Sequence, residues 1–315
     1  MTDWPFLYAR RIGAIGALAL IMMAAWWGSG AQASVRIDET TRVAIISAFE
    51  PELLVLRGSL QDAESHSING VEFLTGALQD KPVVLFLSGV SMTNAAMNTQ
   101  LALDRFKISH IIFSGVAGGV NPELHIGDVT VVERWGQYLE TVAVLEVEPG
   151  RYDAMGVGGE VDAPGFGMFF TRPVMVRSAA QPALHEKFWF DSDPGLLDVA
   201  RRIQSVELTN CDAKGQCLSH RPSLVIGGNG VSGPVFVDNA QLREHLHSAF
   251  QANVVDMESA ACAMVAYSNG VPFIAFRSLS DLAGGGDGAE EVHTFLNLAA
   301  ENSTRVLMAF LKAWQ

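Results

Sequence analysis

Short apolar runs alternate with stretches of helical periodicity over most of the chain. Residues 43–48 are almost entirely apolar and precede Pro51, which predicts a buried strand that leads into a helix. Residues 92–106 carry apolar side chains at helical spacing and predict a helix. Further strands are expected at residues 71–78, 82–87, 111–113, 129–132, 223–227, 253–255 and 272–276, and further helices at 194–203, 239–250, 258–268 and 290–313. This alternation predicts an α/β fold with a central mixed, largely parallel sheet flanked by helices.

One segment, residues 135–222, interrupts the alternation. It is rich in glycine, proline and aromatic residues, and only residues 194–203 have a clear helical pattern. No linker sequence separates it from the rest of the chain. We therefore interpret it as an insertion, at about residues 135–222, in a single domain that spans residues 34–315.

The first 33 residues have the pattern of an export signal. Arg10 and Arg11 precede an apolar run at residues 12–27, and small residues then lead to Ala33, as at a signal peptidase site. The apolar run is short for a bilayer span of ~20 residues, which disfavours a membrane anchor. We expect cleavage after Ala33 and a mature protein in the periplasm or outside the cell, without membrane contact; the sequence leaves the Sec and twin-arginine routes open.

Charge and cysteine content narrow the function classes. The formal net charge is −13, and no basic cluster is present, so nucleic acid is not an expected partner. Cys211 and Cys217 bracket a polar, turn-forming stretch, and in an oxidising compartment we expect them to pair, with two free thiols as the alternative. Cys262 lies in an apolar run and is expected in the core. No cysteine or histidine spacing indicates a metal site.

Polar side chains gather where the predicted strands end. They include Glu50, Glu52, Ser88, Asp256, Glu258, Ser280 and Asp281. Ligands of open α/β sheets bind beyond the carboxyl ends of the strands, so these carboxylates indicate acid–base chemistry on a neutral or basic substrate. The alternative for Asp256 and Asp281 is that each caps the segment that follows it. The glycine-rich residues 115–119 lack the spacing of a dinucleotide fingerprint, and no cofactor is expected.

Several motifs together resemble one enzyme superfamily. They are residues 43–52, residues 88–90, residues 114–119 followed by Gly127-Asp128, residues 255–260 and residues 277–281. Their order and spacing resemble the nucleoside phosphorylase and nucleosidase superfamily over most of residues 42–315, and most closely the 5'-methylthioadenosine/S-adenosylhomocysteine nucleosidases. The export signal, the insertion and the Cys211/Cys217 loop resemble secreted relatives, which include plant vegetative storage proteins.

The resemblance implies a role for each matching residue. Glu52 would polarise the attacking water, and Asp281, supported by Ser280, would give a proton or strong hydrogen bond to purine N7. Glu258 would hold the ribose hydroxyls, with Met257 packed against the sugar. These roles suit the chemistry, because breaking an N-glycosidic bond places positive charge on the ribose and negative charge on the departing base.

The resemblance also implies contacts with the rest of the substrate. Phe236 would stack on the base, and the backbone of Val237 would read its edge. The other expected substrate contacts are Phe49, Ser88, Gly89 and Val116. The family further implies a homo-oligomer.

Water is the expected nucleophile, and the expected reaction is hydrolysis of a purine nucleoside to the free base. Phosphorylases of this superfamily place arginines around the phosphate, where this chain has Phe113 and approximately Glu52, and a carboxylate would repel the anion. Phosphorolysis stays an alternative. A non-catalytic nucleoside-binding or storage protein is another, because Val116 stands where nucleosidases commonly carry a hydroxyl and Phe49 replaces a methionine.

Overall fold

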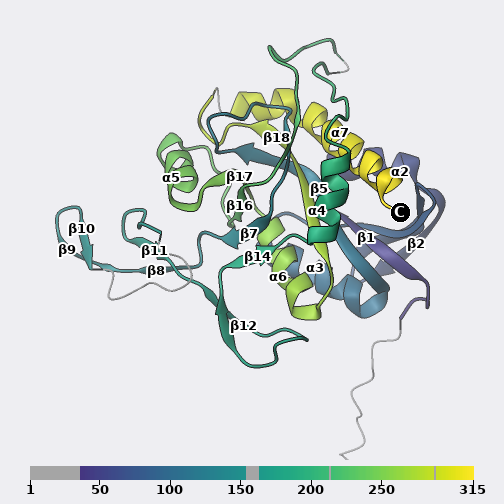
Figure 1. Ribbon diagram of the computed structural model, residues 1–315, viewed down its shortest axis with the longest axis horizontal. Coiled ribbons are helices and arrows are strands. Elements are labelled where there is room, and N and C mark those ends of the chain that lie inside the picture. The colour runs from purple at the N-terminus through teal and green to yellow at the C-terminus, as the bar shows by residue number, and fades with distance from the viewer. Residues whose placement is uncertain (1–35, 154–162, 213, 287–288) are drawn as a thin grey trace, which may run out of the picture.

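The computed structural model describes residues 36–153, 163–212, 214–286 and 289–315, so the expected signal at residues 1–33 lies outside the described residues. A sheet with a parallel centre runs through this part of the chain (Figure 1). β1 (Thr41–Ser47) pairs in parallel with both β4 (Lys81–Leu87) and β5 (Lys107–Gly119), and β5 pairs in parallel with β18 (Phe273–Asp281). The remaining strands of this sheet are β2 (Gln61–Ile68), β3 (Val71–Leu78), β6 (Val129–Val131), β7 (Arg134–Gln137), β14 (Trp189–Asp191), β15 (Leu224–Ile226), β16 (Asn229–Ser232) and β17 (Ala252–Asp256).

Helices cover both faces of the sheet, as the apolar pattern predicts. They are α2 (Glu50–Ser59), α3 (Met92–Arg105), α4 (Pro194–Arg202), α5 (Ala240–Phe250), α6 (Ser259–Asn269) and α7 (Ala289–Ala313). Ala44 and Ile46 of β1 pack in one core with α3 and α6, whereas Val43 and Ile45 pack in a second core with α2, α4 and α7. Successive side chains of a strand point to opposite faces, so one continuous apolar run serves both cores. None of the described helices is long and apolar enough to cross a membrane.

Two central strands are longer than predicted. The sequence indicates strands at residues 111–113 and 272–276, but β5 runs to Gly119 and β18 to Asp281. The end of β5 also pairs with β17, and β18 also pairs with β6, in both cases antiparallel. The glycine-rich stretch and Asp281 therefore lie in strands instead of loops, which gives them fixed positions.

A polar edge strand was not predicted. β2 carries mostly exposed residues and so lacks the apolar run that identifies a buried strand. It is joined to β3 by Asn69-Gly70, both with positive φ, the backbone of a tight hairpin turn. The predicted pair β3–β4 is connected in the same way through Gln79 and Asp80.

The segment at residues 135–222 is built partly into the main sheet. β7 pairs with β16, and β14 pairs with β7, so residues at both ends of the segment belong to the core architecture. Its other strands form separate two-stranded sheets: β8 (Thr141–Ala143), β9 (Leu145–Glu148), β10 (Arg151–Asp153), β11 (Phe169–Thr171), β12 (Val174–Val176) and β13 (His185–Lys187). Figure 1 shows the β8–β11 and β12 hairpins projecting from the body.

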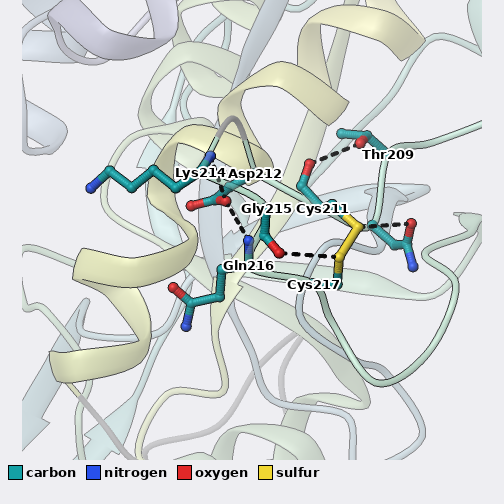
Figure 2. Close-up of a disulfide and its surroundings, with 8 residues drawn as sticks. Thr209, Cys211, Asp212, Lys214, Gly215, Gln216 and Cys217 are labelled. Atoms are coloured by element: carbon teal, nitrogen blue, oxygen red, sulfur yellow. Dashed lines mark hydrogen bonds between the residues drawn. A yellow bond between two sulfur atoms is a disulfide. The ribbon is translucent and has the colours of Figure 1, made fainter.

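A disulfide joins Cys211 and Cys217, as the cysteine spacing predicted. Figure 2 shows the turn between them, in which the Asp212 carboxylate accepts hydrogen bonds from the backbone N–H groups of Lys214 and Gln216 at 2.9 and 2.8 Å. Such side-chain bonds to the backbone stabilise a turn and bring its ends together. Cys262 is buried and free.

Candidate active site

One cavity of about 320 Å³ collects most of the residues predicted to act on substrate. It lies where segments after β1 and β17 meet the ends of β5 and β18. The predicted residues that line it are Phe49, Glu52, Val116, Phe236, Val237, Met257, Glu258, Ser280 and Asp281. Side chains separated by more than 200 positions in the sequence therefore share one site.

Glu52 is fixed at the bottom of the cavity by backbone donors. Its Oε2 accepts hydrogen bonds from the N–H groups of Ala48 at 2.6 Å and Phe49 at 3.3 Å, and its Oε1 accepts one from Val116 at 2.8 Å. Phe49 is the N-cap of α2 and Glu52 its third helical residue, so the bond from the Phe49 N–H to Glu52 closes the first turn of the helix and holds the carboxylate. Burial raises the pKa of Glu52, while Arg277 and the three N–H donors oppose that shift.

Arg277 links two carboxylates beneath the cavity. Its side chain is fully buried; Nε lies 2.8 Å from Asp256 Oδ2, and Nη2 donates to Glu258 Oε2 at 3.3 Å. Nη1 donates to the carbonyl of Val116 at 3.2 Å, and the guanidinium lies 4.0 Å from the ring centroid of Phe113. A buried guanidinium needs such partners, so this network fixes the positions of the groups around it.

The position of the Glu258 carboxylate is fixed by Arg277 at one oxygen and by the strained backbone of Ser91 at the other. Its Oε1 accepts a hydrogen bond from the N–H of Ser91 at 2.9 Å, and Ser91 has a φ of 85°, which is costly for a residue other than glycine. Burial raises the pKa of Glu258 to about 7; Arg277 lowers it, and Asp256 and Glu52 raise it. The carboxyl group can therefore change protonation state near neutral pH.

Asp281 is oriented by its neighbours. Oδ2 accepts a hydrogen bond from Ser280 Oγ at 2.9 Å, and Oδ1 accepts one from the N–H of Ala283 at 2.8 Å. Ala283, like Ser91, has a positive φ, so two strained residues each donate to a carboxylate of the cavity. The predicted support of Asp281 by Ser280 is present in the geometry.

The alternative role for the aspartates, capping, fits Asp256. Its Oδ1 accepts hydrogen bonds from the N–H groups of Glu258 and Ser259 at the start of α6. Asp281 instead lies at the end of β18 and bonds to a turn. Asp256 therefore orders the backbone that carries Glu258.

The mouth of the cavity is apolar. Phe236 is 55% exposed, and Val90 and Val235 are also exposed at its edge, with Leu296 nearby in the lining. An aromatic ring and branched apolar side chains suit the flat face of a heterocycle. Among the described lining residues, none is lysine, arginine or histidine.

Ser88 and Gly89 do not line the cavity, contrary to their expected role. Ser88 is buried; its backbone N–H donates to the carbonyl of Ser47, and its Oγ donates to the carbonyl of Gly89. These bonds shape the loop after β4, and the next two residues reach the site: Val90 by its side chain and Ser91 by its N–H.

The sequence profile described as Phosphorylase superfamily matches residues 42–312. The chain belongs to the Phosphorylase superfamily. The predicted resemblance and the predicted α/β fold class are both confirmed.

Similar members of the Phosphorylase superfamily are nucleosidases. The chain is 30% identical over 272 residues to the 5'-methylthioadenosine/S-adenosylhomocysteine nucleosidase of Tolumonas auensis. The aligned region covers 86% of this chain and 99% of that protein. The crystal structure of S-adenosylhomocysteine nucleosidase from Streptococcus pyogenes, in complex with 5-methylthiotubericidin, has a TM-score of 0.65 and 27% identity and covers 89% of this chain and 99% of that chain. The crystal structure of the Neisseria meningitidis 5'-methylthioadenosine/S-adenosylhomocysteine nucleosidase, in complex with methylthio-immucillin-A, has a TM-score of 0.65 and 25% identity. It covers 86% of this chain and 98% of that chain.

Arg277 is a residue of the site that the sequence pattern of this Phosphorylase superfamily member did not indicate. The available signal was a basic side chain directly after the apolar residues 273–276 of β18, because an arginine in a buried strand must find buried partners. In the part of the chain that the structure describes, no group of three or more histidine, cysteine, aspartate or glutamate side chains is placed to hold a metal ion.

Proposed function

We propose that this protein hydrolyses the N-glycosidic bond of a purine nucleoside, methylthioadenosine-like or a scavenged nucleoside, and releases the free base. The observation that carries the proposal is the meeting of Glu52, Glu258 and Asp281 around one apolar cavity. In the proposed reaction these three groups supply a proton acceptor, a negative charge and a proton donor. Similarity to the nucleosidases of Tolumonas auensis and Streptococcus pyogenes supports the same bond and the same class of substrate.

Glu52 activates the attacking water. A carboxylate offers about four acceptor positions, and the backbone occupies two on Oε2 and one on Oε1. One position on Oε1 is left for a water molecule, whose proton Glu52 takes as the water attacks. The backbone donors favour the ionised form that this role requires.

Glu258 binds the sugar. Ionised, it accepts hydrogen bonds from the ribose hydroxyls and lies close to the positive charge that develops on the ring. Arg277 keeps one of its oxygens in place. Met257, the residue before Glu258, also lines the cavity and contacts the sugar.

Asp281 acts on the leaving base. It gives a proton or a strong hydrogen bond to purine N7 as negative charge builds up on the base, and Ser280 holds it in position. Phe236 stacks on the base, and the backbone of Val237 reads its edge. General acid and general base contributions of this kind are each worth ~10²- to 10⁴-fold in rate.

The charge of the cavity favours water over phosphate. Recognition of phosphate commonly uses arginine or lysine, and no cationic side chain appears among the described residues that line the cavity. Arg277 lies beneath it and is paired with Asp256 and Glu258. A phosphate ion would therefore meet carboxylates without a free cation.

Release of base in phosphate-free buffer tests the proposal. Purified protein is incubated with methylthioadenosine, adenosine and inosine, and free base is measured. We expect turnover without phosphate and a loss of roughly 10²- to 10⁴-fold in kcat for Glu52→Gln and for Asp281→Asn. Glu50→Gln, an exposed position two residues from Glu52, is the matched control and should keep wild-type activity.

Two other outcomes would replace hydrolysis as the function. A strict requirement for phosphate would identify a phosphorylase. Tight calorimetric binding of intact nucleoside without turnover would identify a binding or storage protein, the alternative motivated by Val116 and Phe49.

The proposed activity takes place outside the cytoplasm. The N-terminal pattern of residues 1–33 supports export, and the Cys211–Cys217 disulfide fits an oxidising compartment. Cell fractionation should recover the protein outside the cytoplasm with Ser34 as its first residue. An intact N-terminus on cytoplasmic protein would contradict this.

A further inference from the structure

Outside the catalytic cavity, the described residues line a second cavity of about 270 Å³. His125, His220, Cys217, Leu282 and Phe295 are among its lining residues. Leu282 and Phe295 adjoin Asp281 and Leu296 in the chain, which line the catalytic cavity. The proposed function uses none of the polar groups of this second cavity.

Its main feature is a pair of imidazoles from distant parts of the chain. The ring centroids of His125 and His220 are 4.5 Å apart with an interplanar angle of 55°. His220 Nε2 is buried and has no hydrogen-bond partner among the described residues. A buried polar atom without a partner costs about 1–3 kcal/mol. A ligand that bonds to this nitrogen removes that cost, which favours its binding.

The His220 ring has the surroundings typical of a histidine that binds a metal ion. A hydrogen bond with the backbone of Ile126 engages the ring, and burial, followed by the neighbouring His125, lowers the pKa of His220. Histidines that bind metals usually donate one ring N–H to a carbonyl or carboxylate and ligate through the other nitrogen.

Asp128 stabilises the loop that carries His125. Its Oδ2 accepts a hydrogen bond from the N–H of His125 at 2.9 Å, and its Oδ1 accepts bonds from the N–H and Oγ of Ser223 at 2.7 and 3.1 Å. The carboxylate also places negative charge beside the imidazole pair, which favours a cation there.

We propose that His125 and His220 bind one divalent transition-metal ion, such as Zn²⁺ or Cu²⁺, through one nitrogen of each ring. Imidazole ligands suit these ions, whereas Mg²⁺ and Ca²⁺ prefer oxygen. His125 is exposed, so its side chain is free to turn toward an ion held at Nε2 of His220. Water completes the coordination, since Cys217 is held in its disulfide and offers no thiolate.

Calorimetric titration of the tag-free protein with ZnCl₂ and CuCl₂ tests the site, with MgCl₂ as the hard-cation control. We expect one saturable Zn²⁺ or Cu²⁺ site per chain and no response to Mg²⁺. His125→Gln and His220→Gln should each weaken metal binding by at least ~10-fold. That is the smallest loss usual when a residue that only supports a ligand is replaced, and these residues are the ligands themselves. The Cu²⁺ electron paramagnetic resonance spectrum should show nitrogen ligation that both substitutions change.

His247→Gln is the matched control. His247 is half-buried, and its Nδ1 pairs with the carbonyl of Ala252 outside this cavity. Equal loss of binding in this variant, or unchanged binding in either His125→Gln or His220→Gln, would overturn the proposal. Because His125 is exposed, its substitution tests the pair without removing a buried side chain, and an unchanged thermal midpoint of the metal-free variant would verify its folding.

Discussion

Backbone groups position the acidic side chains of this cavity. Glu52, Glu258 and Asp281 each accept at least one main-chain N–H, and the donors Ser91 and Ala283 have positive φ. Local strain of this kind is maintained only when the surrounding structure determines it. The geometry of single residues in the loops thus depends on the packing of the whole site.

Gly115 is a position where any side chain would displace the catalytic groups. A Cβ atom there would lie 2.5 Å from Glu52 Oε1 and 2.6 Å from Arg277 Nη1. We expect Gly115→Ala to lower the rate of base release by at least ~10²-fold, because a displacement of about 1 Å has that effect on catalysis. Initial rates and thermal unfolding curves measure both consequences.

The control for this substitution is Gly58→Ala in α2. A Cβ at Gly58 meets no atom within 4 Å, so activity should be unchanged and the helix should gain up to ~1 kcal/mol. Wild-type rates for Gly115→Ala would show that Glu52 and Arg277 do not need their present positions.

Glu258 predicts opposite effects of pH on activity and stability. Its pKa of about 7 lies above the ordinary value of 4.5 because the side chain is buried. The ionised form binds the ribose, so kcat/KM should rise as the pH increases through about 7. The folded state holds the proton more tightly than the unfolded state, so the favourable contribution is complete below pH 4.5 and is lost as the pH rises through about 7, at most ~3 kcal/mol.

A pH series of initial rates and of urea unfolding measures both effects. Glu258→Gln cannot ionise and should flatten the rising limb of kcat/KM and the accompanying fall in stability. A rising limb that persists unchanged in Glu258→Gln would assign it to another group.

The elements around the site differ in how they are stabilised. The central strands β1, β5 and β18 bury apolar side chains on both faces, whereas the loop at residues 211–217 is held by its disulfide and the turn at Asp212. A loop that is held by a cross-link and a turn depends on the cross-link for its stability.

Removing the disulfide should therefore cost stability and not activity. We expect Cys211→Ser/Cys217→Ser to lower the free energy of unfolding by about 2 kcal/mol, the chain-entropy value for so short a loop. The described lining of the catalytic cavity includes neither cysteine, so base release should stay at the wild-type rate. Urea denaturation of the wild type in a phosphine reductant should reproduce the loss; no difference between the reduced and oxidised protein would contradict it.

For the whole molecule, the projecting hairpins predict self-association. Two-stranded sheets are marginally stable alone, and their apolar side chains include Leu145, which is 72% exposed, Met168 and Phe169. The N–H of Val144 donates to the carbonyl of Met168, so these side chains come from neighbouring segments, and exposed apolar surface commonly marks a protein interface. Light scattering should give a mass above that of one chain, and Leu145→Asp/Phe169→Asp should reduce it toward the monomer.

The control for association is Ile37→Asp, an exposed apolar position near the start of the described chain and outside the hairpins. It should keep the wild-type mass. A monomeric wild-type protein at micromolar concentration would contradict the predicted homo-oligomer.

The amino-acid sequence by itself determined the α/β class, the boundaries of most helices and buried strands, and the disulfide. Apolar periodicity carries that information locally, as residues 43–48 and 92–106 show. With the family resemblance it also indicated Glu52, Glu258 and Asp281. It did not indicate the edge strand β2, because that strand buries little apolar surface.

Only the tertiary structure decided which of these side chains meet. It left Ser88 out of the cavity lining, joined Arg277 to Glu258, and brought His125 beside His220, 95 positions away in the sequence. Such contacts depend on strand register and on where β5 and β18 end. Pairing between strands that are distant in sequence sets the register and the strand ends, and a local sequence pattern does not predict that pairing.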